Sequence, residues 1–191
     1  MRKLVLFMHT SLDGCVAGPN GELDWIPYDR ELEIYAEGIV NTVGSPMYGR
    51  VTYEMMKSYW PTVLKDSSAS KHDMDHAQWL ENVEKIVFSK TLKKADWNNT
   101  RVISGNIAEE VSRLKKQQGK PVVIFGSPTL AHTCMGLDLI DEYQLTVSPV
   151  ILGSGKALFK EIKNRTNLKL INAKTFNSGV VGFHYERKPH N

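Results

Sequence analysis

The chain has 191 residues, enough for one domain with a substantial core, and its 41% hydrophobic and 24% charged residues are ordinary for a globular protein. A net charge of +3 without a basic block gives no indication of a nucleic-acid partner. No apolar run approaches the roughly 20 residues that span a membrane, and the two cysteines lack metal-ligand spacing. We therefore expect a single cytoplasmic domain over residues 1–191, without a membrane or nucleic-acid partner.

The N-terminal part predicts a strand, a long loop and a helix. Apolar residues 3–8 (KLVLFM) indicate a buried strand. The loop over 11–27 is rich in Gly, Pro and Asn and is too long for a simple connection. Asp29 is suited to cap a helix over 30–39, whose apolar side chains share one face.

The alternation continues through the middle of the chain. Residues 41–49 predict a strand that leads into a helix from about Val51, although Pro46 cannot donate a ladder hydrogen bond. The polar residues 65–76 predict a loop or a weak helix start, and residues 85–89 predict a further strand.

Three strands and two helices are predicted from residue 100 to residue 152. Residues 100–104 indicate a strand, and 107–119 a helix that has lysines near its C-terminus and ends at Gly119. The apolar residues 122–125 indicate a strand buried on both faces, which runs directly into another helix. Residues 142–152 predict one more strand.

The last segment predicts a β-hairpin. Residues 168–176 and 180–188 alternate polar and apolar side chains on either side of the turn 177–179, Asn-Ser-Gly. Strands that alternate with helices imply a sheet covered on both sides. We therefore predict an α/β fold: a mostly parallel central sheet, helices on both faces and a C-terminal antiparallel hairpin.

Two predicted strand ends carry groups that suit an anion. Gly49 ends a strand, Arg50 starts the next helix and Thr52 lies in its first turn, so free N–H groups, the helix dipole and a guanidinium come together. The plainer interpretation is a surface arginine after a tight turn. Ser89 and Lys90 follow another strand and on their own are a weak signal.

A third strand end lies at residues 126–130, where a glycine separates the buried strand from its helix. In open parallel sheets, ligands bind outside the carboxyl ends of the strands. Three such ends favour an extended, multiply phosphorylated ligand. A G-x-G-x-x-G motif is absent, which argues against a Rossmann site.

Six ordered motifs carry a resemblance to a known family: SLDGCVA, YGRVTYE, VFSKTL, FGSPTLA, LIDEYQL and PVILGSGKALF. They resemble the dihydrofolate reductase-like family that includes the C-terminal reductase domain of the bifunctional riboflavin-biosynthesis deaminase-reductase, above all its stand-alone bacterial members. The resemblance covers nearly the whole chain and implies a dihydrofolate reductase-like fold.

The resemblance also implies NADPH as the cofactor, extended along the strand ends. It implies that residues 126–130 cradle the pyrophosphate, that Ser89 and Lys90 lie beside the adenosine 2′-phosphate, and that the first loop shields the nicotinamide. The cofactor-binding residues implied in this way are Val16, Ala17, Gly49, Arg50, Val51, Thr52, Ser89, Lys90, Gly126, Ser127, Thr129 and Leu130.

Three residues of this chain differ from the pattern of that family. Ser127 replaces the second glycine of the usual Gly-Gly pair, Phe7 stands where riboflavin-pathway reductases typically carry a lysine, and Phe125 stands where they carry a glutamate. Losing buried hydrogen bonds from such a cation and carboxylate weakens the binding of a polar substrate. The zinc-deaminase motifs H-x-E and P-C-x-x-C are absent, so a bifunctional enzyme is not expected.

The candidate catalytic residues are the carboxylates Glu31 and Asp13. Dihydrofolate reductases place an acid on the helix after the first loop, and at about 100° per residue Glu31 lies at the edge of the apolar face whereas Glu37 points away. Asp13 either contacts substrate or stabilises the turn at Gly14. His9 ends the first strand, as a buried histidine or a proton donor.

Two further motifs have plain interpretations. His72 and His76 would share a face if helical and could then bind a metal, but no third ligand is evident, so we expect a polar loop and no metal. Residues 152–159 (LGSGKALF) lack the K-[ST] ending of a phosphate loop and are interpreted as a turn.

The sequence thus predicts an NADPH-dependent reductase of a small heterocyclic or carbonyl substrate, related to the riboflavin-pathway 5-amino-6-(5-phosphoribosylamino)uracil reductase. Dihydrofolate reduction is one alternative. A non-catalytic NADPH-binding sensor or dimer module is another, and a homodimer is compatible with either kind of function.

Overall fold

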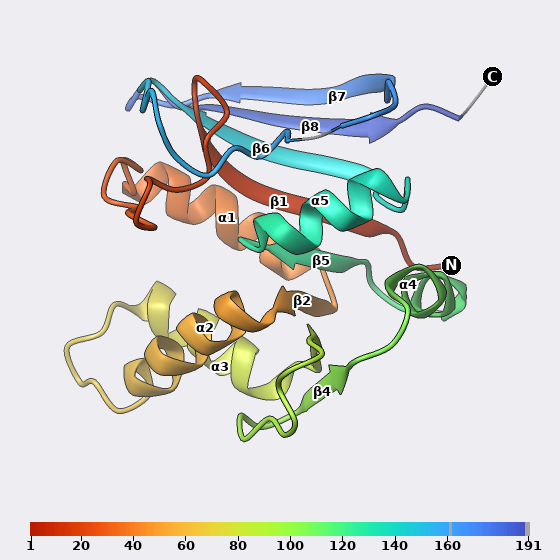
Figure 1. The fold of residues 1–191 in the computed structure, drawn as a ribbon. Coiled ribbons are helices and arrows are strands. Elements are labelled where there is room, and N and C mark those ends of the chain that lie inside the picture. Colours follow the sequence, from red (N-terminus) through yellow and green to blue (C-terminus); the bar gives the residue numbers. More distant parts are fainter. Residues whose placement is uncertain (161, 190–191) are drawn as a thin grey trace.

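The computed structural model describes residues 1–160 and 162–189; the other three positions, including the end of the predicted domain at residue 191, lie outside it. Five helices and one eight-stranded sheet make up this part of the chain (Figure 1). The strands are β1 (Leu4–Ser11), β2 (Ser45–Gly49), β3 (Lys85–Phe88), β4 (Thr100–Ile103), β5 (Val122–Phe125), β6 (Glu142–Ser148), β7 (Leu168–Thr175) and β8 (Val181–Arg187). The helices are α1 (Arg30–Thr42), α2 (Arg50–Val63), α3 (Lys71–Asn82), α4 (Ile107–Lys116) and α5 (Pro128–Gly136).

The sheet has the predicted mixture of directions. Its strand order is β4-β3-β2-β5-β1-β6-β8-β7. All pairs from β4 to β6 are parallel, whereas β8 pairs antiparallel with both β6 and β7. The α/β fold with a mostly parallel sheet and a C-terminal antiparallel hairpin is therefore confirmed.

Helices cover both faces of the sheet because the central strands are apolar on both sides. Leu4 and Leu6 of β1 pack in one cluster with residues of α4 and α5. Val5 and Phe7 point to the opposite face and pack with residues of α1, α2 and α3. Because successive side chains of β1 point to opposite faces, each face of the sheet is apolar and is covered by its own helices. Figure 1 shows α1 and α5 on opposite sides of β1.

The parallel strands bring several helix N-termini to one edge. β2 passes directly into α2, and β5 reaches α5 after only two residues. Because parallel strands end on the same side of a sheet, the starts of α2 and α5 become neighbours. This edge positions the candidate site.

Three local predictions need correction. The segment around His72 is helical rather than a loop, because Ser70 caps α3 by accepting a hydrogen bond from the Asp73 N–H. β6 ends at Ser148, since Pro149 cannot extend the ladder. α4 ends at Lys116, before the predicted Gly119.

The predicted Asp29 cap is confirmed, and the structure accommodates Pro46 within its strand. The Asp29 carboxylate caps α1 by accepting from the Leu32 N–H. Pro46 lies inside β2, but the pairing of β2 with β3 begins only at Met47, so the proline precedes that ladder. None of the helices in the described part of the chain is both long and apolar enough to cross a membrane.

Candidate active site

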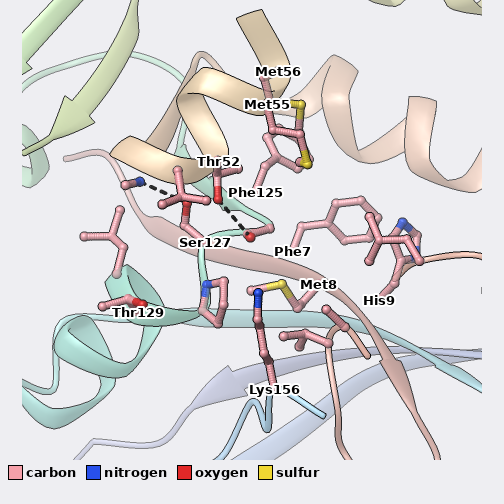
Figure 2. Close-up of a pocket in the computed structure, with 18 of the residues that line it drawn as sticks. Phe7, Met8, His9, Thr52, Met55, Met56, Phe125, Ser127, Thr129 and Lys156 are labelled. Atoms are coloured by element: carbon pink, nitrogen blue, oxygen red, sulfur yellow. Dashed lines mark hydrogen bonds between the residues drawn. The ribbon is translucent and has the colours of Figure 1, made fainter. Parts of the chain in front are cut away.

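A cavity of about 620 Å³ opens at the carboxyl edge of the parallel strands, where α2 and α5 begin. Figure 2 shows side chains from β1, β5, α2 and the loop at residues 152–159, called the 150s loop below, pointing into it. The full lining is Phe7, Met8, His9, Val16, Ala17, Gly21, Leu23, Ile26, Tyr28, Ala36, Glu37, Val40, Gly49, Arg50, Val51, Thr52, Met55, Met56, Trp60, His72, His76, Phe88, Ile107, Phe125, Gly126, Ser127, Pro128, Thr129, Leu130, Thr133 and Lys156.

The ends of β2 and β5 are tied together at the mouth of this cavity. The Gly49 N–H donates to Ser127 Oγ at 2.9 Å, and Thr52 Oγ1 donates to the Gly126 carbonyl at 3.2 Å (Figure 2). Gly126 has a φ of +58°, a conformation that suits glycine. The serine at the second position of the usual Gly-Gly pair therefore has a defined structural role, because it holds two strand ends in register.

The first loop forms another wall of the cavity by pairing with the 150s loop. The Val16 N–H donates to the Lys156 carbonyl at 2.8 Å, and the Lys156 N–H donates to the Ala17 carbonyl at 2.9 Å. A methyl group added to Gly155 would lie 2.4 Å from the Ala17 carbonyl oxygen, so glycine permits this close approach. The pairing holds Val16 and Ala17 against the cavity.

Two cations line the cavity. Arg50 stands at the start of α2 and pairs with Glu54 at 2.8 Å, with both side chains about half exposed. Lys156 projects from the 150s loop toward the cavity (Figure 2). Sequence reasoning interpreted the Lys156 segment as a turn and missed this lysine, because only the tertiary pairing with Val16 and Ala17 places it beside the first loop.

Ten of the twelve predicted cofactor residues line the cavity. The two that do not are Ser89 and Lys90, which follow β3 at the same edge of the sheet. Ser89 Oγ accepts hydrogen bonds from the backbone N–H groups of Thr91 and Leu92 and so closes a local turn. Their contact with a 2′-phosphate stays a prediction, as does cofactor binding by the other ten.

Neither predicted catalytic carboxylate lines the cavity. The Asp13 carboxylate accepts hydrogen bonds from Ser11 Oγ and from the N–H groups of Leu152 and Gly153, and these bonds lower the pKa of Asp13 to about 2. Asp13 thereby joins the first loop to the 150s loop. Asp13 does not line the cavity, and its contact with substrate stays a prediction.

Glu31, in the first turn of α1, is not among the residues that line the cavity. Its carboxylate accepts the Asn177 N–H at 2.8 Å and so ties the start of α1 to the β7–β8 turn. The expectation that Glu31 reaches the cavity is therefore not met, since this bond directs the carboxylate toward the hairpin.

Glu37, rather than Glu31, is the carboxylate of α1 that lines the cavity. The prediction that Glu37 points away is wrong, because the buried face of α1 includes Val40 as well as Ala36 and is thus rotated toward Glu37. Glu37 Oε2 lies 3.6 Å from His72 Nδ1 across the α1–α3 contact. Within the described residues, Glu37 is the one carboxylate in the cavity lining.

Two histidines of the lining are half-buried and held neutral near neutral pH. His9 Nδ1 lies 2.6 Å from Thr146 Oγ1, and burial lowers the pKa of His9 to about 4. His76 lies between the rings of Trp60 and Trp79, and burial together with the nearby His72 lowers its pKa to about 4. His9 is therefore a poor imidazolium proton donor.

An aromatic chamber forms the apolar end of the cavity. We use this name for the lining residues Phe7, His9, Tyr28, Glu37, Met56, Trp60, His72, His76 and Phe125. Ring contacts connect it: Phe7 lies 5.6 Å from Phe125 and 5.1 Å from His9, centroid to centroid. Such walls suit a flat, apolar ligand.

The two helical histidines do not form a metal site with their neighbours. Among residues 1–160 and 162–189 there is no group of three or more His, Cys, Asp or Glu side chains placed to hold a metal ion.

Comparisons with known proteins identify the family. The model of the RibD C-terminal domain matches residues 2–182, so the chain belongs to that family, and its fold is the dihydrofolate reductase-like reductase fold. The chain is 36% identical to the uncharacterized protein YyaP of Bacillus subtilis (strain 168) over 186 residues, 96% of this chain and 94% of YyaP. It is 31% identical to YwjB of the same organism over 187 residues, covering 97% and 98%.

Solved structures share the fold at lower identity. A putative riboflavin biosynthesis protein from Shewanella sp. PV-4 has a TM-score of 0.77 and 22% identity, covering 98% of this chain and 99% of that one. The deaminase/5-amino-6-(5-phosphoribosylamino)uracil reductase of Thermotoga maritima has a TM-score of 0.68 and 15% identity, covering 98% and 57%. Dihydrofolate reductase from Enterococcus faecalis, complexed with NADP(H) and RAB-propyl, has a TM-score of 0.62 and 16% identity, covering 98% and 97%.

Proposed function

We propose that this protein is an NADPH-dependent reductase of a small, flat heterocyclic or carbonyl substrate. The observation that carries the proposal is the continuity of one cavity. It runs from the N-termini of α2 and α5, with Arg50 and Lys156, to the aromatic chamber. One end suits phosphates and the other an apolar ring system. Membership of the RibD C-terminal domain family supports a riboflavin-pathway-type reductase in the broad sense.

The residues at the edge of the sheet fit a dinucleotide. Free N–H groups at the starts of two helices and the two cations favour binding of anionic groups. The positive φ at position 126 favours glycine, so the turn into α5 carries no side chain there. We propose that residues 126–130 bind the pyrophosphate and that Arg50 and Thr52 bind the adjacent phosphate region. Bound NADPH would supply the hydride for the reduction.

The other walls shape the reaction space. The paired loops at Val16 and Lys156 cover the side of the cavity where the nicotinamide is proposed to lie, and they exclude water from it. Phe7 and Phe125 form an apolar floor without a cation. Because a phosphoribosyl group needs cationic or hydrogen-bonding partners, we propose a substrate less polar than that of the riboflavin pathway.

Titration calorimetry tests the cofactor assignment. We expect wild-type protein to bind NADPH more tightly than NADH, and Arg50→Ala to weaken NADPH binding about 10-fold, the value of one charge-assisted phosphate contact. Arg113→Ala, on the exposed face of α4, is the matched control and should bind as wild type does. A wild-type protein that does not bind NADPH would rule out the reductase proposal.

The displaced carboxylates favour one alternative function. Since Asp13 and Glu31 are engaged outside the cavity, a non-catalytic NADPH-binding sensor is the second candidate. A sensor would bind NADPH without oxidising it in the presence of any carbonyl or imine acceptor. Steady NADPH consumption, followed by its absorbance, would exclude the sensor.

A further inference from the structure

His72 is a buried histidine without a hydrogen-bond partner. Its side chain is only 6% exposed, its Nδ1 atom is fully buried, and no acceptor or donor lies within hydrogen-bonding distance of that atom in the described structure. Burying a polar nitrogen without a partner is costly. The imidazole also lines the cavity, so a bound ligand can contact the ring.

Glu37 is the group that faces this imidazole. Its Oε2 atom lies 3.6 Å from His72 Nδ1, and its side chain is 43% exposed while it also lines the cavity. Glu37 thus contacts both bulk water and the chamber. A carboxylate in that position can exchange protons with solvent and hold an imidazolium in a fixed orientation.

The remaining titratable groups of the chamber are less suited to give up a proton. Burial keeps His9 and His76 neutral near pH 7, and it raises the pKa of Tyr28 to about 12. Among the other charged groups, His76 on α3 interacts with His72 and Asp73, whereas Glu33 and Asp73 face Tyr28.

We propose that His72 is the proton donor of the reduction proposed above, that Glu37 positions its imidazole from the Nδ1 side, and that the donated proton is replaced from water between turnovers. The inference rests on that proposed function. As hydride reaches the carbon of a C=O or C=N bond, the π electrons move to the oxygen or nitrogen. That atom then takes the proton from the His72 imidazolium: an N–H bond breaks, an O–H or N–H bond forms, and NADPH leaves as NADP⁺.

Two hydride acceptors separate proton delivery from hydride transfer. 4-Nitrobenzaldehyde needs both a hydride and a proton, whereas the 2-methyl-3,4-dihydroisoquinolinium cation accepts a hydride and needs no proton. Both are flat and apolar enough for the chamber. The variants are Glu37→Gln and His72→Asn, and Glu33→Gln is the matched control, because Glu33 lies one turn earlier on α1 and pairs with Arg30 outside the cavity lining.

The first measurement is NADPH binding by calorimetry, which we expect to be unchanged within about 2-fold in all three variants. The second is the rate of NADPH oxidation. We expect Glu37→Gln and His72→Asn to lose about 10²-fold or more with the aldehyde, as for a missing general acid, and less than about 3-fold with the iminium cation. Glu33→Gln should match wild type with both acceptors.

The outcomes separate the two proposals. Failure of wild-type protein to bind NADPH would reject the proposed function and this inference together. Normal NADPH binding with aldehyde and iminium rates reduced by equal factors, or not reduced at all, would reject the proton-donor role alone.

A third measurement decides the case in which wild type turns over neither acceptor. In NMR spectra of histidine-labelled protein, Glu37→Gln should move the ring signals of His72, because it replaces the facing carboxylate with a neutral amide. The signals of His9 and His76 should stay those of neutral rings from pH 6 to 8. A His72 signal that is the same in Glu37→Gln and wild type would overturn the inference.

Discussion

At the scale of single residues, Lys85 is the most unusual charge of the fold. Its side chain is fully buried at the start of β3, where Nζ donates to the carbonyls of Leu80 and Val83 at the end of α3 and lies 4.8 Å from the Trp97 ring centroid. Burial lowers the pKa of Lys85 to about 8. A cation at the C-terminus of a helix is favourable, but its desolvation is not.

This lysine predicts a pH-dependent stability. Between about pH 8 and 10 the unfolded chain binds a proton at Lys85 that the folded chain does not, so the free energy of unfolding rises with pH, by on the order of 2–3 kcal/mol. In Lys85→Met this contribution disappears. Urea unfolding of both proteins at pH 7, 8, 9 and 10, followed by circular dichroism, measures the difference.

Lys93→Met, at an exposed lysine, is the control for a lost surface charge. A difference in stability between wild type and Lys85→Met that stays constant from pH 7 to 10 would show that Lys85 keeps the same charge in the folded and unfolded states.

At the scale of elements, the contact between the first loop and the 150s loop depends on Gly155. The Cβ of an alanine there would lie 2.4 Å from the Ala17 carbonyl oxygen, too close for any real contact. Gly155→Ala must therefore displace the pairing of Val16 with Lys156. We expect a loss of about 1–3 kcal/mol in stability and faster amide exchange at Val16, Lys156 and Leu158.

Gly153→Ala provides the matched comparison for that loop. Gly153 also has a positive φ, of +71°, but a Cβ added to it would meet nothing within 4 Å. Gly155 has a φ of +156°, so both alanine variants carry some backbone strain, and only the one at Gly155 adds a collision. Equal exchange rates at Val16 in the two variants, measured by hydrogen–deuterium exchange, would contradict the collision argument.

At the scale of the whole molecule, the homodimer stays a prediction, and we propose that it would form through β7, one of the two edge strands of the sheet. β7 is an edge strand with exposed side chains along nearly its whole length, including Leu170 at 51% and Ile171 at 46% exposure. Unpaired edges with apolar side chains favour association. We expect light scattering to give the mass of a dimer, and Leu170→Lys with Ile171→Lys to give a monomer of unchanged circular dichroism.

Leu137→Lys is the control for this experiment, since Leu137 is 46% exposed at the end of α5 and does not belong to the β7 edge. A wild-type protein with the mass of a monomer, or a double variant that remains a dimer, would remove β7 as the interface.

Much of the architecture was predictable because local patterns have local causes. The run of four apolar residues at β5 favours a strand covered on both faces, and Asp29 caps α1 through a bond to a residue three positions away. The α3 segment was predicted only as a loop or a weak helix start because its sequence is polar, and it becomes a full helix through the Ser70 cap and the packing of Ala77 and Leu80.

The candidate site was predictable only in part, and the reason is helix phase. Val40 belongs to the buried face of α1 because α3 packs beside that helix, and this contact turns Glu37 to the cavity. No periodicity within α1 contains that information. Glu31, in contrast, is drawn away by the Asn177 N–H of a hairpin 146 residues later in the chain.

The sequence by itself determined the alternation of strands and helices, the glycines at the ends of β2 and β5, and the family that these ends indicate. Each of these features depends on residues that are close together in the chain. Only the tertiary structure decided which charged groups meet in the cavity. Lys156, Glu37 and His72 come from three separate segments, and contacts between those segments bring them to one cavity. Side-chain direction at such contacts is set by packing between elements, which local sequence does not encode.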